Sequence, residues 1–219
     1  MVEYFVPIKS LKEYIKDENL GAIHHLIRYR WAVEVLKDIN PNTIIDIACG
    51  AGYGTYQIGK ELPNASVVGV DYDPNAVDYA KNNFSLKNIT YNLGNVLSWD
   101  FGIFDCIVCF DTIEHISHRE IMMENIVNNV NLCLILSTPC GHKADILAPA
   151  WDGHKIEYSS ASLYRFLSRY FGKIVRPDGD NFPHLNIFNK IDYFLCMNPV
   201  VCYNPIRILD NPYEEFGYP

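Results

Sequence analysis

Three observations predict an α/β fold built on a doubly wound, mostly parallel sheet of seven strands. Short β-branched segments alternate with segments of helical periodicity along most of the chain. The first expected strand, residues 43–48, runs directly into a turn with glycines at positions 50, 52 and 54. The second expected strand ends in Asp71, about twenty residues beyond that turn. A strand, a glycine-rich turn and a later acidic residue are typical of nucleotide-binding α/β domains.

The N-terminal part is expected to form helices and then the first strand. Residues 8–16 and 22–37 place apolar side chains at intervals of three and four, which is helical spacing. The Pro-Asn pair at 41–42 ends the second helix, and residues 43–48 follow as a buried strand. We therefore interpret residues 1–40 as N-terminal helices that cover a ligand site.

The middle of the chain repeats strand and helix. Asp73 suits an N-cap and Pro74 the first turn of a helix, so these two residues predict where one helix begins. Further helices are expected over residues 52–61, 74–83 and 118–129, and further strands over 66–70, 88–92, 104–110 and 131–137.

After Pro139 the rhythm changes. Residues 141–155 look like a loop and residues 160–170 like a helix. Closing strands are expected at 173–176 and 191–197. The main domain is thus assigned to residues 41–200, and residues 201–219 are expected to form a short irregular C-terminal tail.

Composition limits the classes of function. With 219 residues, of which 49% are hydrophobic, the chain can form one globular domain with a sizeable core. The formal net charge of −8 disfavours long nucleic-acid partners, which need a basic surface. No apolar run reaches membrane-spanning length, and the N-terminus lacks the pattern of a signal peptide. The cysteines lie mostly in apolar, strand-like segments, which indicates reduced thiols and predicts a cytoplasmic location.

The spacing of the glycines narrows the ligand. Gly50, Gly52 and Gly54 form a G-x-G-x-G pattern, whereas the dinucleotide fingerprint is G-x-G-x-x-G. Its third glycine permits close helix–strand packing over a pyrophosphate. The pattern here therefore favours a nucleoside ligand without a pyrophosphate.

Four segments in the right order resemble the class I S-adenosylmethionine (SAM)-dependent methyltransferases. Residues 46–54 resemble the first motif of that family and residues 69–74 its acidic second-strand motif. Residues 104–111 and 134–139 resemble its fourth and fifth strands. The resemblance implies a Rossmann-like methyltransferase fold in which residues 41–200 bind SAM.

The resemblance also implies roles for individual residues. The turn from Cys49 to Gly52 would lie against the methionine part of SAM, with Arg28 pairing with its carboxylate. Asp71 would bind the ribose and Tyr72 would flank the adenine. The predicted cofactor-binding residues are Arg28, Asp46, Ala48, Cys49, Gly50, Gly52, Asp71, Tyr72, Asn95, Val96 and Asp111.

The adenine edge would meet Asn95 and the backbone amide of Val96. The family usually has an aspartate at the position of Asn95. Because an amide oxygen still accepts a hydrogen bond from the adenine amino group, weaker binding rather than loss is expected.

A second group of residues is expected to carry the chemistry. If a helical turn starts at Asp111, then Asp111, Glu114 and His115 share one face at the end of the fourth strand. His154 can reach the same place from the following loop. A base or a metal ion helps a hydroxyl acceptor to lose its proton, so these four residues are the candidate catalytic residues.

The pattern of these four residues resembles metal-assisted O-methyltransferases of the ubiquinone-biosynthesis and small-RNA 3′-end types. It also resembles methyltransferases encoded beside glycan genes. The resemblance to the first two groups implies a divalent ion, Mg²⁺ or Mn²⁺, held by Asp111, Glu114, His115 and His154. Without a metal, Glu114 and His115 would shape the pocket and His154 would bind a backbone carbonyl.

The expected function is SAM-dependent methyl transfer to a hydroxyl of a small molecule or sugar. The alternatives are metal-dependent 2′-O-methylation of an RNA 3′ end and a non-catalytic SAM-binding or structural protein. The acidic charge favours the small acceptor over RNA.

Overall fold

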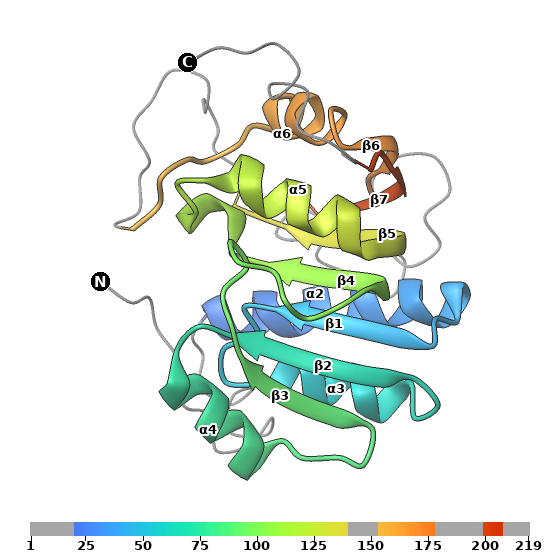
Figure 1. Cartoon of the computed structure of the whole chain (residues 1–219), viewed down its shortest axis with the longest axis vertical. Coiled ribbons are helices and arrows are strands. Elements are labelled where there is room, and N and C mark those ends of the chain that lie inside the picture. Colours follow the sequence, from blue (N-terminus) through green and yellow to red (C-terminus); the bar gives the residue numbers. More distant parts are fainter. Residues whose placement is uncertain (1–19, 140–152, 178–198, 208–219) are drawn as a thin grey trace.

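The computed structural model describes residues 20–139, 153–177 and 199–207. Its centre is one seven-stranded sheet in the order β3-β2-β1-β4-β5-β7-β6 (Figure 1). All neighbouring strands are parallel except those that pair with β7, which runs antiparallel to β5 and β6. The strands are β1 Thr43–Ile47, β2 Ser66–Asp71, β3 Ile89–Leu93, β4 Phe104–Phe110, β5 Val130–Ser137, β6 Phe171–Val175 and β7 Val200–Pro205.

Helices cover both faces of this sheet. In the view of Figure 1, α2 and α3 lie behind the sheet and α5 lies in front of it. The described helices are α2 Leu20–Ile39, α3 Tyr53–Glu61, α4 Pro74–Asn83, the short 3₁₀ helix η1 Ile113–His115, α5 Arg119–Asn129 and α6 Ser160–Leu167. Asp73 caps α4 as expected, since its carboxylate accepts a hydrogen bond from the amide of Asn75 at 2.9 Å.

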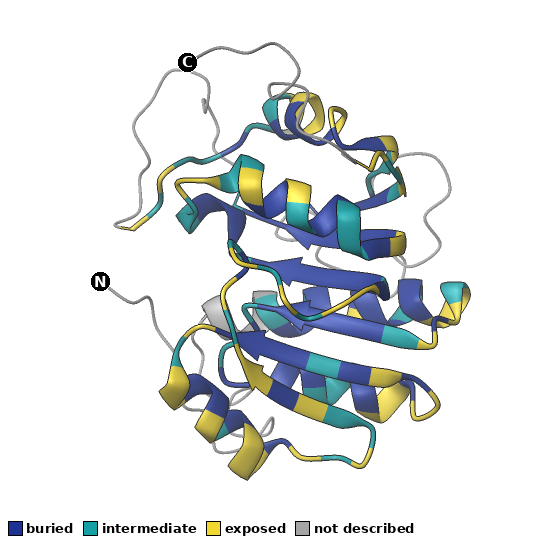
Figure 2. Ribbon diagram, viewed as in Figure 1, coloured by how far each residue is buried: buried dark blue, intermediate teal, exposed yellow. Residues whose placement is uncertain are grey.

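The sheet separates two halves of the core because successive side chains of a strand point to opposite faces. On β1, Ile44 belongs to the half that packs under α2 and α3, whereas Ile45 belongs to the half under α5 and α6. The central strands are therefore buried on both faces, while β3 at the edge is largely exposed (Figure 2). This two-sided burial explains why the strands read as continuous apolar segments in the sequence.

The expected fold class is confirmed, with a difference at the C-terminal end. The sequence analysis put the last strand at 191–197 and an irregular tail at 201–219. Residues 191–197 lie outside the described residues, and β7 occupies Val200–Pro205, so the expected boundary at residue 200 is wrong. The sequence of β7 has no clear strand pattern, and the segment forms a strand because it pairs with β5 and β6. The expected helix over residues 8–16 also lies outside the described residues.

None of the described helices combines the length and the apolar character needed to cross a lipid bilayer. The described cysteines, namely Cys49, Cys106, Cys109, Cys133 and Cys202, have free and buried thiols. That burial agrees with the interpretation of the cysteines as core residues.

Parallel pairing brings the carboxyl ends of β1, β2 and β4 to the same edge of the sheet. The glycine turn follows β1, and its Cys49 amide donates to the Val70 carbonyl oxygen at the end of β2 (2.9 Å). Asp111 follows β4, and its amide donates to the Ser137 carbonyl oxygen at the end of β5 (3.1 Å). In doubly wound sheets this edge is where ligands bind.

Candidate functional site

Asp71 fixes the backbone of the glycine turn through hydrogen bonds. One carboxylate oxygen of Asp71 accepts from the Gly50 amide at 2.8 Å, and the other accepts from the Asp73 amide at 3.0 Å. Asp71 is 8% exposed, and burial raises the pKa of its carboxyl group while the two amides oppose that rise. Asp71 therefore fixes the turn from its position at the carboxyl end of β2.

Positive φ angles shape the same turn. Ala48, Gly50 and Gly52 have φ angles of 58°, 53° and 84°. A Cβ atom on Gly52 would lie only 2.5 Å from the Cβ of Ala80, so glycine is required there on steric grounds as well. Cys49 is buried in this turn, and burial raises the pKa of its thiol, which makes it a packing residue rather than a nucleophile.

Asp46 lies beneath the turn and is fully buried. Its oxygens accept from the Thr55 hydroxyl at 2.7 Å and from the Tyr29 hydroxyl at 3.2 Å. Burial raises the pKa of Asp46 to about 7, although both hydroxyl groups favour the ionised form. Asp46 thus connects β1, α2 and α3 under the expected position of the cofactor.

This pKa predicts a pH dependence of stability without ligand. An aspartate with a raised folded-state pKa binds a proton more tightly in the folded protein, so its contribution is lost as pH rises from about 4 to about 7. Asp46→Asn is neutral at every pH, and hydroxyl groups can donate or accept, so Tyr29 and Thr55 can still pair with the amide. We expect the unfolding free energy of the wild type, relative to Asp46→Asn, to fall by roughly 2 to 4 kcal/mol over that range in urea titrations. A constant difference between the two proteins across this range would contradict the assignment.

The expected adenine contacts lie beyond β3. The Asn95 side-chain oxygen accepts from the Leu97 amide at 2.9 Å, so this oxygen holds the loop that presents Val96. The Val96 carbonyl oxygen accepts from the Asn125 side chain at 2.9 Å, which anchors the loop to α5. The side chain of Tyr72 is exposed. Tyr72 follows β2, whereas Asn95 and Val96 follow β3, so the three residues lie at the carboxyl ends of two neighbouring parallel strands.

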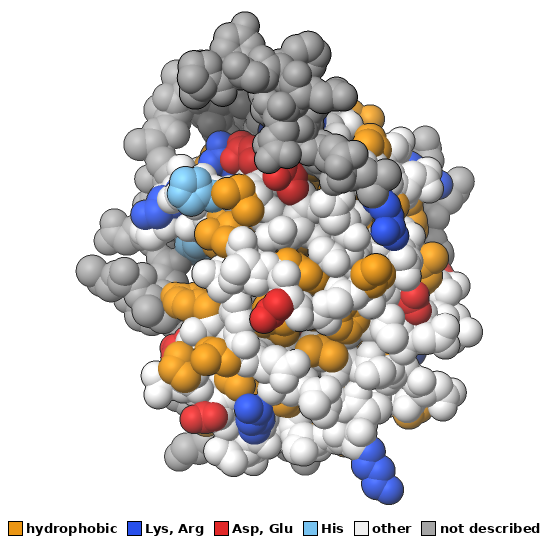
Figure 3. Space-filling model, in the orientation of Figure 1, with side chains coloured by type: hydrophobic (Ala, Val, Ile, Leu, Met, Phe, Trp, Pro, Cys, Tyr) orange, Lys and Arg blue, Asp and Glu red, His pale blue; other side chains and the backbone are white. Residues whose placement is uncertain are grey.

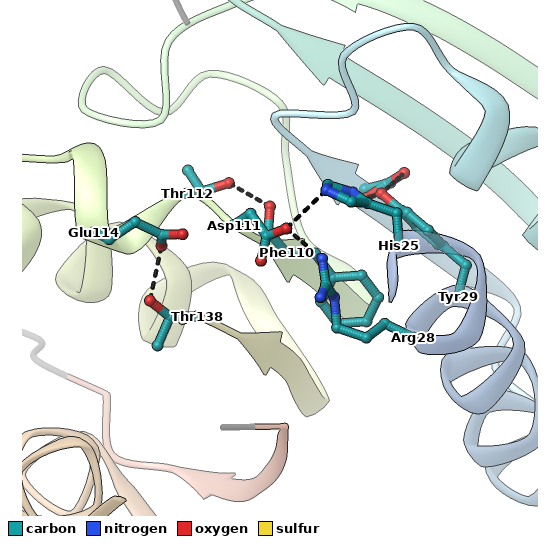
Figure 4. Close-up of polar contacts among 9 residues, drawn as sticks. His25, Arg28, Tyr29, Phe110, Asp111, Thr112, Glu114 and Thr138 are labelled. Atoms are coloured by element: carbon teal, nitrogen blue, oxygen red, sulfur yellow. Dashed lines mark hydrogen bonds and ion pairs between the residues drawn. The ribbon is translucent and has the colours of Figure 1, made fainter. Parts of the chain in front are cut away.

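Asp111 pairs with two residues of α2, His25 and Arg28 (Figure 4). It has a φ angle of 48°, and the same carboxylate oxygen pairs with Arg28 and lies 3.0 Å from Nε2 of His25. Arg28 is 1% exposed, so its guanidinium is buried beside Asp111 rather than on the surface of α2. The Nε and Nη1 atoms of Arg28 are buried with no hydrogen-bond partner among the described residues.

Glu114, His115 and His154 form a separate cluster, which we call the Glu-His-His cluster. One potential ligand atom from each residue lies within 4.8 Å of the others. Glu114 is fully buried, and its carboxylate accepts from the Thr138 hydroxyl at 2.8 Å. Burial, reinforced by the charge of Asp111, raises the pKa of Glu114 to about 8.

Backbone contacts bring His154 to this cluster. The Glu114 carbonyl oxygen accepts from the Lys155 amide at 2.6 Å, which fixes the loop beside η1. The rings of His115 and His154 meet edge to face with centroids 4.7 Å apart. Nδ1 of His154 lies 2.9 Å from a carboxylate oxygen of Glu157, and Nδ1 of His115 lies 3.4 Å from the Gly153 carbonyl oxygen.

The structure thus brings together three of the four residues expected to bind a metal. Asp111 is instead paired with Arg28 and His25, because Asp111 takes a left-handed backbone conformation rather than starting the helical turn. Tyr29, Thr55 and Thr138 belong to the site although no pattern in the sequence points to them. His25 does have a visible signal, since it precedes Arg28 by three residues on one helix and therefore shares its face.

Comparison with known proteins places this geometry in a family. The family model described as a methyltransferase domain matches residues 40–167, more than half of the chain. The chain belongs to this methyltransferase family. A ubiquinone biosynthesis O-methyltransferase of Coxiella burnetii is 31% identical over 86 residues, which cover 37% of the chain and 36% of the relative. The corresponding Rickettsia typhi protein is 25% identical, over 56% of the chain and 54% of the relative. The chain thus spans only about a third to a half of the length of these curated relatives.

Two solved structures illustrate the similarity of fold. The N-terminal domain of EvdMO1, solved in the presence of SAH and D-fucose, is 15% identical with a TM-score of 0.61, over 81% of this chain and 82% of that one. The methyltransferase domain of bacterial CtHen1-CN is 19% identical with a TM-score of 0.61, over 82% of this chain and 99% of that one. At these identities the likeness concerns the fold. The expected fold and family, those of a class I SAM-dependent methyltransferase, are confirmed.

Proposed function

We propose that this methyltransferase transfers the methyl group of SAM to a hydroxyl group of a small molecule or sugar. The observation that supports this most is that the Asp71-braced glycine turn and the Glu-His-His cluster lie at the same edge of the sheet. The first can hold a nucleoside, and the second offers groups that polarise a hydroxyl. The curated relatives are named O-methyltransferases, and one structural neighbour was solved with a sugar, D-fucose.

In this proposal the cofactor lies across the carboxyl ends of β1, β2 and β4. The turn from Ala48 to Gly52 faces the methionine part, and Asp71 binds the ribose hydroxyls. Arg28 pairs with the carboxylate of SAM, because its buried Nε and Nη1 atoms have unused donors that suit an anion. Tyr72 covers the adenine, and Asn95 and Val96 meet its edge.

The reaction then needs an acceptor oxygen in line with the bond between the methyl carbon and sulfur. The acceptor O–H bond breaks, its oxygen forms a bond to the methyl carbon, and the carbon–sulfur electrons return to sulfur. The products are a methyl ether, S-adenosylhomocysteine and a proton. The protein's task is to position the acceptor and to receive that proton.

A divalent ion fits the Glu-His-His cluster. A buried carboxylate with two imidazoles is a mixed oxygen–nitrogen set with only three protein ligands, which suits a transition-metal ion such as Mn²⁺ with open coordination positions better than a closed zinc site. The Nδ1 atom of each histidine lies near an acceptor, and such contacts would orient the rings for binding a metal through Nε2. A bound ion would polarise the acceptor hydroxyl. Asp111 is not in this set, because it pairs with residues of α2.

Metal binding can be measured directly. We expect Mn²⁺ to bind the purified, chelator-treated protein with one site per chain, and His154→Gln to weaken that binding roughly tenfold to a hundredfold. Calorimetry and the electron paramagnetic resonance of free Mn²⁺ both report it. His118→Gln is the matched control, since His118 is exposed and outside the cluster. If the two variants bind Mn²⁺ equally well, the cluster is not the metal site.

The RNA 3′-end alternative is favoured by the Glu-His-His cluster but not by charge. The net charge is −8, and on the face shown in Figure 3 the Lys and Arg side chains are scattered rather than gathered into one patch. A turnover screen with sugars, phenols and a short RNA separates these acceptors. Methylation of the RNA alone would overturn our choice of a small acceptor. SAM binding without turnover on any acceptor would favour a non-catalytic protein.

A further inference from the structure

We propose that His25 accepts the proton that the acceptor hydroxyl loses, and that Asp111 is the positioning residue that orients it. The inference rests on the proposed methyl transfer and assigns a residue to one step of it. It comes from the pairing of a partly exposed imidazole on α2 with a carboxylate that follows β4. The expectation from the sequence gave neither residue this role.

His25 stands over the edge of the sheet where the ligand site lies. Its ring meets the ring of Tyr53, the first residue of α3 after the glycine turn, with centroids 6.4 Å apart. One turn further along α2, Tyr29 packs on Tyr53 and on Phe110, the last residue of β4. The imidazole therefore lies between the turn that faces the methyl donor and the end of β4.

The Asp111 carboxylate fixes the imidazole. Its oxygen lies 3.0 Å from Nε2 of His25, which suits an Nε2–H donor and leaves Nδ1 as the basic nitrogen. Asp111 itself is held by its amide bond to Ser137 and by Arg28 on the same carboxylate oxygen. Arg28 is buried and permanently charged, so its ion pair holds the Asp111 carboxylate in place.

The charged and titratable groups around His25 fit this role. Asp111 faces it from β4, Arg28 from its own helix, and Tyr53 from α3, among the residues that the structure describes. The side chain of His25 is 35% exposed, whereas that of Asp111 is 18% exposed. A substrate can therefore reach the imidazole but has less access to the carboxylate behind it.

The proton balance is complete without an additional reactant. The acceptor O–H bond breaks and its proton moves to Nδ1 of His25, while the oxygen attacks the methyl carbon. The carbon–sulfur bond breaks and its electron pair stays on sulfur, which becomes a neutral thioether. The imidazolium, stabilised by Asp111, returns the proton to water after product release.

The first test is His25→Gln, with His118→Gln as the matched control on an exposed histidine. We expect His25→Gln to lower kcat/KM for a hydroxyl acceptor by roughly a hundredfold to ten-thousandfold and to remove the acidic limb of its pH profile. SAM affinity by calorimetry should change less than about threefold, and the control should match the wild type. An unchanged pH profile in His25→Gln would overturn the proposal.

A second comparison excludes a merely structural role. An acceptor that is already ionised at the assay pH, such as a nitrophenol, needs no base. Its methylation should therefore be nearly insensitive to His25→Gln, whereas methylation of an alcohol or sugar is lost. Equal losses for both acceptors would mean that His25 only supports the fold.

A third measurement does not depend on turnover. Nitrogen-15 NMR of the SAM-bound protein should show the neutral ring of His25 protonated at Nε2, and Asp111→Ala, which removes the acceptor oxygen, should abolish that preference. A ring protonated at Nδ1 would overturn the inference even if no acceptor has been found. Absence of wild-type turnover on every acceptor would instead contradict the proposed function, and the NMR result would still decide the pairing.

Discussion

Replacing Asp71 with asparagine should weaken SAM binding roughly tenfold to a hundredfold. In the structure the two carboxylate oxygens of Asp71 accept from the amides of Gly50 and Asp73. Asparagine has only one acceptor oxygen, so one of these amides would face an NH₂ group instead. Losing a hydrogen bond to a charged group costs about 1.5 to 3 kcal/mol, and the ribose would lose the same charged partner.

Asp73→Asn is the matched control for this prediction. It makes the same charge change two residues away, and asparagine caps a helix about as well as aspartate does. Calorimetric titration with SAM, or with S-adenosylhomocysteine, measures both variants. Equal affinities for the two would show that Asp71 shapes the turn without binding the cofactor.

The cofactor half of the site was predictable because its signals are local. The strand 43–48, the glycine spacing and Asp71 lie within about thirty residues, and parallel pairing of adjacent strands brings them together. Backbone rules then suffice, since Gly52 needs a positive φ and Asp73 with Pro74 starts α4 wherever the rest of the chain lies.

For the residues expected to carry the chemistry, the sequence indicated which residues take part but not how they are arranged. Glu114 and His115 are neighbours in sequence, but His154 joins them through the backbone bond between Lys155 and Glu114, which no pattern announces. The partners of Asp111 depend on its backbone conformation, which has a positive φ angle. Residue types alone do not predict a positive φ angle for an aspartate after a strand. Some site residues take their hydrogen-bond partners from α2, as Asp46 does from Tyr29. These contacts depend on how α2 packs against the sheet, which the local sequence does not show.

The β7 strand shows the same limit at the level of the fold. Its sequence, Val200–Pro205, has two prolines nearby and no clean alternation, so it resembled a tail. It forms a strand because β5 and β6 offer it antiparallel partners on both sides. Its proline at position 205 is tolerated at the end of the strand, where the ladder stops.

Replacing Glu114 with glutamine should lower turnover roughly a hundredfold to a thousandfold while leaving SAM affinity nearly unchanged. Glutamine keeps the shape of the side chain and an oxygen that can accept from Thr138, but it removes the carboxylate from the Glu-His-His cluster. The backbone carbonyl oxygen of residue 114 still accepts from the Lys155 amide, so the position of the loop should persist.

Stability should distinguish a chemical role of Glu114 from a structural one. Because the pKa of Glu114 is raised to about 8, the wild type loses stability as pH rises from about 4.5 to about 8, and glutamine avoids this cost. At pH 8 the melting temperature of Glu114→Gln should therefore equal or exceed that of the wild type.

Glu124→Gln, on an exposed position of α5, serves as the control for loss of one negative charge and should keep full turnover. Single-turnover kinetics with saturating SAM separate the chemical role from the structural one. If Glu114→Gln loses turnover and SAM affinity in parallel, Glu114 supports the cofactor site or the fold and does not act on the acceptor.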